Sequence, residues 1–352
     1  MRIAICSSPL LDGHNVRGIG TYTKNLIKSL RGYPDLNIQE FSNINEVKMA
    51  DVVHYPYFDL FQKSLPFYTK FPTIVTIHDV IPLAYPKSYP AGIKGSFNKH
   101  LQVLSLKNVK AIITDSKASK QEIIKYLKVP AKKIFPIALA PADNFHKITD
   151  SQRLTNIKEK YSLPEKFALF VGSVNWNKNI LNLTKAALDA GIDLVLIGKS
   201  FQEKGNLEHP EMKNFKEFLR LYSNNPKIHI LGFMDNEDLV AVTNSANVLL
   251  LPSIAEGFGL PILEAQVCGV PVITSNISSM PEVAQNGALL VDPYSIEDIS
   301  KAIIKIISEE KTRNELIKLG YENVSKFSWE KVAQETVDVY KIVIQGAVSK
   351  RI

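Results

Sequence analysis

The chain has 352 residues, of which 45% are hydrophobic and 22% charged, and this is the composition of an ordinary globular protein. At roughly 150 residues per domain the length predicts two domains, and the composition excludes disordered, collagen-like and disulfide-rich chains. The formal net charge is +7. It is uneven, because residues 1–150 carry 20 Lys+Arg against 11 Asp+Glu, whereas the rest carries 22 against 24. A basic surplus in one half indicates a partner such as nucleic acid, an anionic membrane or a phosphorylated substrate.

The first residues, MRIAICSSPLL, alternate like a buried strand and lack the apolar core of a signal peptide. No apolar run approaches the roughly 18 residues of a membrane span. Cys6 and Cys268 are the only cysteines, and both lie in apolar stretches. We therefore expect a cytoplasmic protein with reduced, buried cysteines.

In chain order, short apolar strands alternate with amphipathic helical stretches. The first half has strand patterns at 2–9, 51–56, 73–79, 111–116 and 133–137. Between the first two, Ile19, Tyr22, Leu26 and Leu30 form the stripe of a helix that covers a sheet. The second half has strand patterns at 167–173, 192–199, 227–233, 247–253, 270–275 and 288–293.

Alternation of strand and helix predicts a parallel sheet covered on both faces, and here it occurs twice. The polar stretch 140–164 is the expected hinge region. We predict an α/β protein of two doubly wound, Rossmann-like domains that face a cleft, with boundaries at 1–150 and 151–328. Ligands of such sheets bind beyond the carboxyl ends of the strands.

The most informative stretch is LLLPSIAEGFGLPILEAQVCGVPVITS, residues 249–275, which reads strand, glycine-rich loop, helix and strand. Backbone N–H groups of this loop, at the start of a helix, favour a phosphate group. Glu264 can accept hydrogen bonds from two vicinal hydroxyls, and Glu256 points toward what the phosphate carries. Taken alone, each glutamate is equally well a surface or dipole-complementing residue. The loop residues that we expect at the phosphate are Gly257, Phe258, Gly259 and Leu260.

The EGFGLPxLEA pattern resembles the retaining glycosyltransferases of family 4, which have the GT-B fold. The resemblance extends over VPVITSNISSMPEVAQNGALLVDP (270–293), FSWEKVA (327–333) and ILGFMDNEDLVAVTNSANVLLLPS (230–253). It implies that the first domain binds the acceptor, that the second binds a nucleotide diphosphate sugar, and that a helix at about 329–352 packs back on the first domain. It also implies Glu256 as a catalytic group and Glu264 as a ligand of the donor.

The segment VGSVNWNKN, residues 171–179, follows another strand and leads into a helix near Lys178. An ammonium there can neutralise a pyrophosphate as its bond to the sugar breaks, and in isolation it is equally a solvated lysine. Lys178 and Asn179 match the family, whereas Ser173 replaces its usual arginine. We place Lys178 among the catalytic groups, and Gly172, Ser173 and Asn179 at the donor.

Two features of the first half belong to the same resemblance, and a third, His54, is a candidate because it follows a strand pattern in the same way. Gly18 and Gly20 open a helix after the first strand and resemble the family's GIGRY segment, so we assign them to donor binding. His78 and Asp79 follow the strand TIVTI, and in the family this histidine lies near the transferred sugar, so His78 is the third catalytic candidate. We expect Asp79, and His54 in DVVHYPYF, on the acceptor side.

No Asp-x-Asp occurs in the chain, so we expect no metal and no other cofactor. The wording HDVIPLAYP favours mannose from GDP-mannose, with UDP- or dTDP-sugars as alternatives. The expected acceptor is a saccharide or a lipid-linked saccharide of surface polysaccharide biosynthesis. A nucleotide-sugar epimerase of the same architecture remains an alternative, as does a basic adaptor for a membrane or nucleic acid, although no nucleic-acid module is present.

The stretch AGIKGSFNKHLQVLSLKNVK carries an apolar stripe of Ile93, Phe97, Leu101 and Leu104 together with four lysines, Lys94, Lys99, Lys107 and Lys110. Such a helix either rests on anionic lipid at the inner face of the plasma membrane or packs its stripe on the sheet. The sequence leaves both arrangements open.

Overall fold

The computed structural model describes residues 1–11, 18–202 and 206–348. The chain divides into two compact units. Unit 1 comprises Met1–Pro86, Pro90–Ala140 and the described part of Ser328–Ile352, and unit 2 comprises Lys87–Tyr89 and Pro141–Phe327.

Unit 1 is built on a six-stranded parallel sheet in the order β2-β1-β3-β4-β5-β6. In the register of this sheet, Ile5 of β1 lies opposite His54 of β3. Its strands are β1 (Arg2–Cys6), β2 (Asn37–Phe41), β3 (Val52–Tyr55), β4 (Thr73–Thr76), β5 (Ala111–Thr114) and β6 (Ile134–Pro136). Its helices are α1 (Gly18–Leu30), α2 (Ile81–Ala84), α3 (Gly92–Ser105), α4 (Lys117–Leu127) and α13 (Trp329–Val348).

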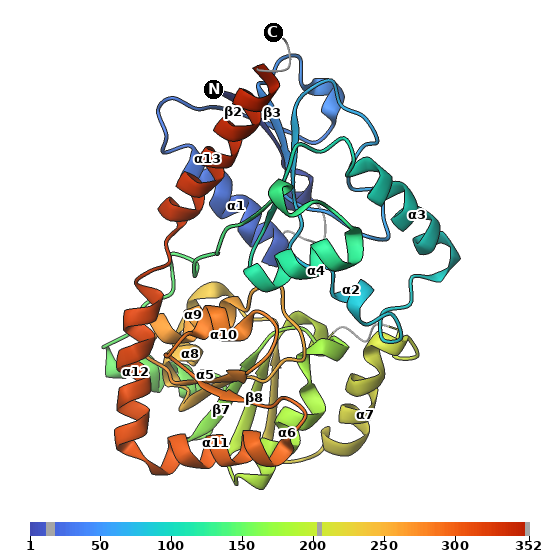
Figure 1. The fold of residues 1–352 in the computed structure, drawn as a ribbon. Coiled ribbons are helices and arrows are strands. Elements are labelled where there is room, and N and C mark those ends of the chain that lie inside the picture. The colour runs from blue at the N-terminus through green and yellow to red at the C-terminus, as the bar shows by residue number, and fades with distance from the viewer. Residues whose placement is uncertain (12–17, 203–205, 349–352) are drawn as a thin grey trace. The chain divides into compact units, whose positions relative to one another are not determined.

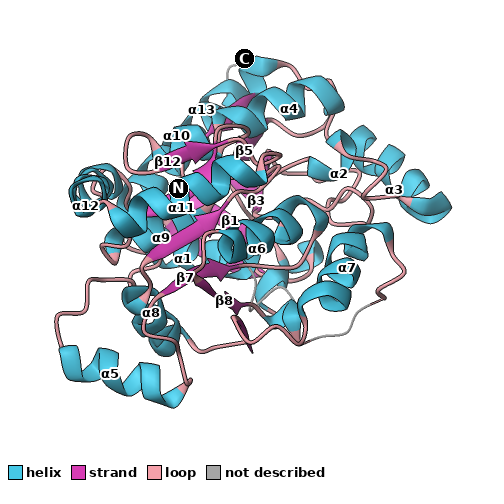
Figure 2. Cartoon of the chain, turned by 90° about the horizontal axis from the view of Figure 1, so that it is seen from below, coloured by secondary structure: helices cyan, strands magenta, loops and turns pink. Residues whose placement is uncertain are grey.

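Unit 2 has a second parallel sheet in the order β12-β11-β10-β7-β8-β9. Its strands are β7 (Phe167–Val171), β8 (Asp193–Ile197), β9 (Ile228–Gly232), β10 (Val248–Leu251), β11 (Val272–Ser275) and β12 (Leu289–Val291). Its helices are α5 (Ser151–Lys160), α6 (Ile180–Asp189), α7 (Lys213–Tyr222), α8 (Asn236–Ser245), α9 (Leu260–Val267), α10 (Met280–Ala284), α11 (Ile296–Ser308) and α12 (Glu310–Val324). In both units helices surround the central strands (Figures 1 and 2).

The strand orders fix where each sheet leaves room for a ligand. In unit 1 the chain proceeds from β1 to β2 in one direction and from β3 onward in the other, so the order reverses between β1 and β3. In unit 2 it reverses between β7 and β10. Connections diverge on either side of such a switch point, and a crevice is left at the carboxyl ends of the two strands.

The predicted fold class is confirmed, and every predicted strand is present with its ends shifted by a few residues. Strand β2 was not predicted, because its sequence NIQEF is polar and it lies at the edge of its sheet. The expected hinge at 140–164 is only partly irregular, since it contains α5, whose first amides bind the side chain of Asp150. Of the predicted final helix, residues 349–352 lie outside the described residues.

Helix α3 turns its polar face inward. Its buried residues are Gly95, Asn98, Gln102 and Ser105. Ile93 and Phe97, in contrast, are 95% and 64% exposed. The inward polar groups are paired, since Asn98 Nδ2 donates to the Phe61 carbonyl at 2.9 Å. The alternative in which the apolar stripe packs on the sheet is therefore wrong for its first half.

A buried chain of hydrogen bonds connects α13 to the sheet of unit 1, where α13 runs beside α1 (Figure 1). The Tyr340 hydroxyl lies 2.8 Å from His54 Nδ1, and His54 Nε2 lies 2.8 Å from Thr76 Oγ1. Thr76 Oγ1 lies in turn 3.1 Å from the Tyr22 hydroxyl on α1. Burial lowers the pKa of His54 to about 3, so its ring is neutral and can donate on one nitrogen and accept on the other.

Cys6 and Cys268 are buried and free, as predicted. Burial raises the pKa of the Cys268 thiol to about 12, which keeps it protonated. Among the described residues, no helix combines the length and apolar character needed to cross a bilayer.

We expect Tyr340→Phe to lower the free energy of unfolding by about 1–3 kcal/mol, because it leaves a buried His54 nitrogen without a partner. Urea denaturation measures this change. The matched control is Tyr33→Phe, which removes a more exposed tyrosine–α13 contact, 3.2 Å from Gln334 Oε1, and should change stability by less than about 0.5 kcal/mol. Equal effects of the two changes would contradict a structural role for the buried chain.

Candidate active site

The glycine-rich loop after β10 lies at the switch point of unit 2. Gly259 has φ +110°, which an L side chain rarely adopts, and it immediately precedes α9. Phe258 is buried against Phe327, with ring centroids 6.3 Å apart. Ser279 Oγ lies 3.0 Å from the Glu256 carbonyl oxygen and 2.8 Å from that of Phe258. The loop is therefore held rigid, and because the Phe258 ring is buried, what this residue can offer a ligand is its backbone.

Lys178 and Glu256 form an ion pair at this switch point. Lys178 Nζ lies 2.7 and 2.8 Å from the two carboxylate oxygens, and Ser253 Oγ donates to Glu256 Oε1 at 2.7 Å. The side chains are only 19% and 9% exposed. Two residues that the sequence predicted separately are thus in direct contact, and Lys178 and Ser253 together fix the direction of the Glu256 carboxylate.

Asn177 and Asn179 join the loop after β7 to its neighbours. Asn177 Nδ2 donates to the Ala255 carbonyl at 2.7 Å, and its Oδ1 accepts from the Tyr89 hydroxyl at 2.6 Å. Asn179 has φ +58° and is 3% exposed, and its Nδ2 donates to the carbonyls of Pro252 and Pro293 at 2.9 and 2.7 Å. The side-chain amide of Asn179 therefore holds two loops together, and the assignment of Asn179 to donor binding stays a prediction.

Gly172 and Ser173 directly follow β7 and are half-buried. The loop after β8 approaches them closely, since a Cβ on Gly198 would lie 1.9 Å from the Gly172 carbonyl oxygen. Ser200 Oγ also accepts from the Val174 amide at 3.1 Å. Lys199 therefore lies in a loop that borders Ser173, and it is a cationic residue that the sequence analysis missed.

Glu264 lies in the second turn of α9, half-buried. Burial raises the pKa of its carboxyl to about 7. The two glutamates of the EGFGLPxLEA pattern thus differ in environment, because Glu256 has a cation and a hydroxyl as partners whereas Glu264 is desolvated without a described ion pair. Such a difference separates the roles of two carboxylates.

In unit 1, His78 follows β4 and binds two acceptors. Its Nδ1 lies 2.7 Å from Asp115 Oδ2, and its Nε2 lies 3.2 Å from the Pro56 carbonyl oxygen. A carboxylate and a carbonyl only accept, so these two contacts favour a His78 ring that is protonated on both nitrogens. Burial alone would lower the pKa of His78, but the charges of Asp115 and Asp79 and the hydrogen bonds to Asp115 and Pro56 together raise it.

Asp115 at the end of β5 is a residue that the sequence analysis missed. It is 3% exposed, and its Oδ1 is buried with no hydrogen-bond partner among the described residues. Asp79 Oδ1 accepts from the Ile81 amide at 3.0 Å, at the start of α2. Both carboxylates therefore surround His78 and favour its charged form.

The expectation that His54 follows a strand and lines the acceptor side is wrong. His54 lies within β3, its exposed fraction is 0%, and both ring nitrogens are engaged in the buried chain described above. Gly18 and Gly20 lie in the first turn of α1, with Gly18 exposed and Gly20 buried, and the adjoining loop residues 12–17 lie outside the described residues.

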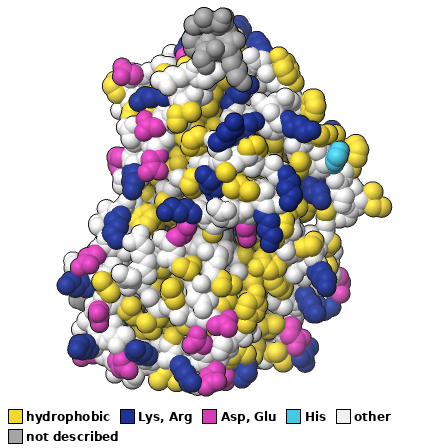
Figure 3. Space-filling model, in the orientation of Figure 1, with side chains coloured by type: hydrophobic (Ala, Val, Ile, Leu, Met, Phe, Trp, Pro, Cys, Tyr) yellow, Lys and Arg dark blue, Asp and Glu magenta, His cyan; other side chains and the backbone are white. Residues whose placement is uncertain are grey.

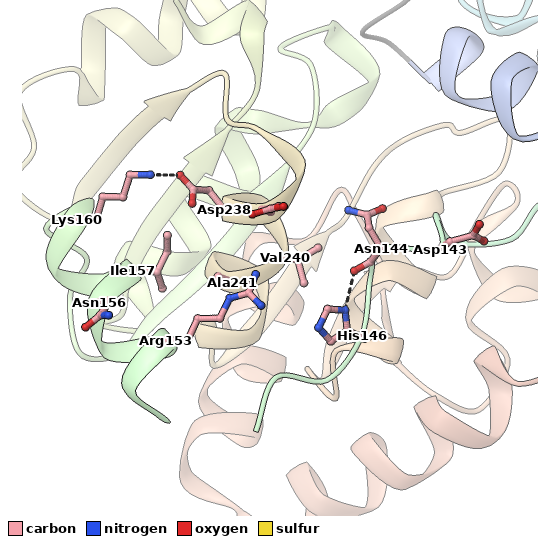
Figure 4. Close-up of a pocket in the computed structure, with 11 residues that line it drawn as sticks. Asp143, Asn144, His146, Arg153, Asn156, Ile157, Lys160, Asp238, Val240 and Ala241 are labelled. Atoms are coloured by element: carbon pink, nitrogen blue, oxygen red, sulfur yellow. Dashed lines mark hydrogen bonds and ion pairs between the residues drawn. The ribbon is translucent and has the colours of Figure 1, made fainter. Parts of the chain in front are cut away.

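A separate hollow of about 670 Å³ lies between α5 and α8 in unit 2 (Figure 4). Its charges are of both signs, and Lys160 Nζ lies 2.5 Å from Asp238 Oδ2. None of the predicted site residues lines it. Among the described residues, no group of three or more His, Cys, Asp and Glu side chains is arranged to hold a metal ion.

Two doubly wound units, with an ion pair and a glycine-rich helix start at the switch point of the second, define an α/β protein of the GT-B glycosyltransferase class. Solved structures share this fold. Sucrose-phosphate synthase from Thermosynechococcus elongatus has a TM-score of 0.75 at 18% identity and covers 98% of this chain and 100% of its own. Anabaena HepE, in complex with UDP and glucose, has a TM-score of 0.73 at 16% identity over 97% and 99%.

The family model described as glycosyl transferases group 1 matches residues 153–323. The chain is 31% identical over 277 residues to the O-antigen chain mannosyltransferase B of Escherichia coli. This alignment covers 77% of this chain and 70% of that relative. It is 29% identical over 289 residues to the serotype-specific mannosyltransferase WbdA of Escherichia coli, of whose length it spans about a third (34%). The chain belongs to the group 1 glycosyltransferases, and this membership implies a nucleotide-sugar donor and a saccharide acceptor.

The raised pKa of Glu264 predicts a pH dependence of stability. Between about pH 4.5 and pH 7 the native state keeps a proton that the unfolded state releases, so stability falls as the pH rises through this window. We expect the free energy of unfolding of the unmodified protein, relative to Glu264→Gln, to fall by about 2–3 kcal/mol from pH 5 to pH 8.

Urea denaturation at both pH values measures the difference. Glu159→Gln, at an exposed position of α5, serves as the control and should not alter the pH dependence. Parallel pH profiles for the unmodified protein and Glu264→Gln would contradict the raised pKa.

Proposed function

We propose that the protein is a retaining, metal-independent mannosyltransferase that transfers mannose from GDP-mannose to a saccharide or lipid-linked acceptor in surface polysaccharide biosynthesis. The observation that carries this proposal is the Lys178–Glu256 pair beside the start of α9. Mannose is favoured because relatives of about 30% identity are named mannosyltransferases. In this proposal unit 2 binds the donor and unit 1 the acceptor.

The residues of unit 2 fit the charges that develop when a sugar–phosphate bond breaks. Negative charge grows on the diphosphate, and the positive end of the α9 dipole together with Lys178 and Lys199 stabilises it. Positive charge grows on the sugar, and the fixed carboxylate of Glu256 stabilises it. In this proposal the start of α9 and the two lysines stabilise the diphosphate, as a divalent metal does in enzymes with an Asp-x-Asp motif.

Glu264 is proposed to accept hydrogen bonds from the ribose of the donor. Its raised pKa means that the charged acceptor form becomes dominant only above about pH 7. His78 is proposed to act as a cation near the transferred sugar. Both of its ring nitrogens already have acceptors, so His78 acts on the substrate through its positive charge. It can donate a hydrogen bond to the sugar only if its Nε2 leaves the Pro56 carbonyl.

The function is tested by supplying radiolabelled GDP-mannose, UDP-sugars and dTDP-sugars to the protein with a saccharide acceptor extract, in the presence of EDTA. We expect label to move from GDP-mannose onto the acceptor at full rate in EDTA, with retained anomeric configuration. Restoration of a lost rate by Mn²⁺ or Mg²⁺ would contradict metal independence. An isomerised donor without labelled acceptor would indicate the epimerase instead.

In the same assay, Glu256→Gln and Lys178→Ala should each lower kcat by about 10²–10³, the loss expected for one electrostatic stabiliser of a transition state. Glu264→Ala should act mainly on the donor KM, because ribose contacts are equal in the ground and transition states. The control is Lys185→Ala, which breaks an exposed ion pair with Asp189 on α6. Near-normal kcat in Glu256→Gln and Lys178→Ala would contradict their assignment.

We also propose that unit 1 binds an anionic membrane surface at the cytoplasmic face through α3. Ile93 and Phe97 are exposed beside Lys94 and Lys99, while the inward face of this helix is polar. Figure 3 shows hydrophobic and basic side chains side by side where α3 and α4 lie. An exposed apolar stripe flanked by lysines fits a lipid surface with anionic headgroups.

We expect the protein to sediment with phosphatidylglycerol vesicles at low salt and to be released at high salt, because salt screens the lysines. The double changes Ile93→Ser/Phe97→Ser and Lys94→Glu/Lys99→Glu should each abolish binding. The control is Ile304→Ser/Ile342→Ser, at isoleucines 47% and 51% exposed on α11 and α13. Protein that stays in the supernatant at low salt, or equal loss in the control, would overturn this proposal.

A further inference from the structure

Unit 1 contains two adjoining hollows of different chemistry. The first, which we name the head hollow, has about 290 Å³ and lies at the carboxyl ends of β1 and β3, the switch point of this sheet. Its lining is polar and aromatic and includes Ser8, Tyr57, Asp59 and Gln62. The second, the chain hollow, has about 590 Å³ and lies beside α3. Its lining is mainly apolar and includes Ile44, Leu65, Pro66, Phe67 and Leu101.

The two hollows adjoin each other, because Ser42, Tyr55, Lys63 and Ser64 line both of them. Lys63 is exposed, and no described residue forms a hydrogen bond or ion pair with its ammonium group. Asp59, the carboxylate of the head hollow, is already engaged. Its Oδ1 accepts from the Phe61 and Gln62 amides at 2.6 and 2.9 Å, and its Oδ2 accepts from the Tyr57 hydroxyl at 2.7 Å. The junction therefore presents a positive charge.

The segment Ser64–Leu65, whose first residue lines both hollows, is held in place by a buried side-chain amide from α3. Gln102 is 2% exposed. Its Oε1 accepts from the Ser64 amide, the Ser64 hydroxyl and the Leu65 amide at 3.0–3.1 Å, and its Nε2 donates to the Leu65 carbonyl at 3.0 Å. This explains why α3 buries a polar face. It also means that the hollows are preformed, which lowers the entropy that a ligand would lose on binding.

The outer end of the chain hollow is apolar and open. Phe67 lines it and is 61% exposed, and the neighbouring Tyr68 is 75% exposed. The Phe67 carbonyl accepts from Asn108 Nδ2 at 2.7 Å, so this exposed aromatic edge is tied to the residues that follow α3. A ligand in the hollows thus meets polar groups, then a cation, then apolar surface that leads outward.

We propose that the two hollows form one acceptor site for a saccharide joined through phosphate to an apolar chain. The saccharide occupies the head hollow, the phosphate binds Lys63, and the first part of the apolar chain occupies the chain hollow and leaves past Phe67. This order matches the order of the lining groups, with hydroxyl-binding and aromatic side chains first, a cation at the junction and hydrocarbon beyond it. The assignment rests on the proposed function, since the ligand is the acceptor of that transfer.

The test measures binding of farnesyl phosphate, as monomers, to the full chain by isothermal titration calorimetry. Farnesol and inorganic phosphate are the two comparison probes. We expect farnesyl phosphate to bind at least tenfold more tightly than either, because only it engages both Lys63 and the chain hollow. Inorganic phosphate that binds as tightly as farnesyl phosphate would indicate a free-phosphate site and overturn the proposal.

Variants locate the binding. Lys63→Ala should weaken farnesyl phosphate binding about tenfold without changing farnesol binding, and Lys63→Arg should restore it. Ser42→Trp, at an exposed position that lines both hollows, should weaken the binding of both farnesyl phosphate and farnesol. Lys48→Ala, at another exposed lysine of unit 1 that lines neither hollow, is the matched control. Equal weakening by Lys48→Ala and Lys63→Ala, or none by Lys63→Ala, would overturn the site.

The failure of this site is distinguishable from failure of the proposed function. A protein that transfers mannose to acceptor extract but binds farnesyl phosphate no better than inorganic phosphate keeps its function and loses this acceptor site. A protein that binds farnesyl phosphate at Lys63 but transfers no sugar from any nucleotide donor keeps the site and loses the function.

Discussion

Both sheets are parallel throughout, and this constraint places the two charged pairs of the candidate site. All strands of a parallel sheet end at the same edge, so loops that are distant in sequence converge there. In unit 2 the convergence brings Lys178, which follows β7, into contact with Glu256, which follows β10. In unit 1 it brings His78 to Asp115, across neighbouring strands β4 and β5. The loops differ, but the sheet edge decides which of them meet.

The Lys178–Glu256 pair has a second property that follows from its burial. A partly desolvated charge is stable only with its partner, and removing one member leaves the other uncompensated. The loops that carry the pair are accordingly fixed by Asn177, Asn179 and Ser279, whose side chains bind backbone carbonyls. A rigid carboxylate next to a rigid ammonium is suited to a reaction in which opposite charges separate, because neither group has to reorganise as the charges develop.

Local patterns predict the parts of the molecule that local physics determines. Alternation of strand and helix predicted both sheets, and the EGFGLPxLEA stretch predicted a glycine-rich turn into a helix, which Gly259 and α9 provide. The partners that define the chemistry come from elsewhere in the chain. Asp115 lies 37 positions from His78, and Tyr340 lies 286 positions from His54. No sequence pattern around His54 distinguishes a histidine at the end of a strand from one buried within it. Its buried position depends on Tyr340, which is distant in sequence and binds its ring.

The position of α13 has a consequence for how the chain reaches its native state. This helix follows unit 2 in sequence but belongs to unit 1, where it supplies the hydroxyl that binds His54. As the ribosome releases the chain, all of unit 2 emerges before unit 1 can be closed. Until then His54 of β3 lacks the Tyr340 hydroxyl as a partner, and the side of α1 that α13 contacts is uncovered. A nascent chain therefore carries an incomplete first unit through the synthesis of the second, and a premature stop before residue 329 leaves unit 1 open and exposed to chaperones and proteases.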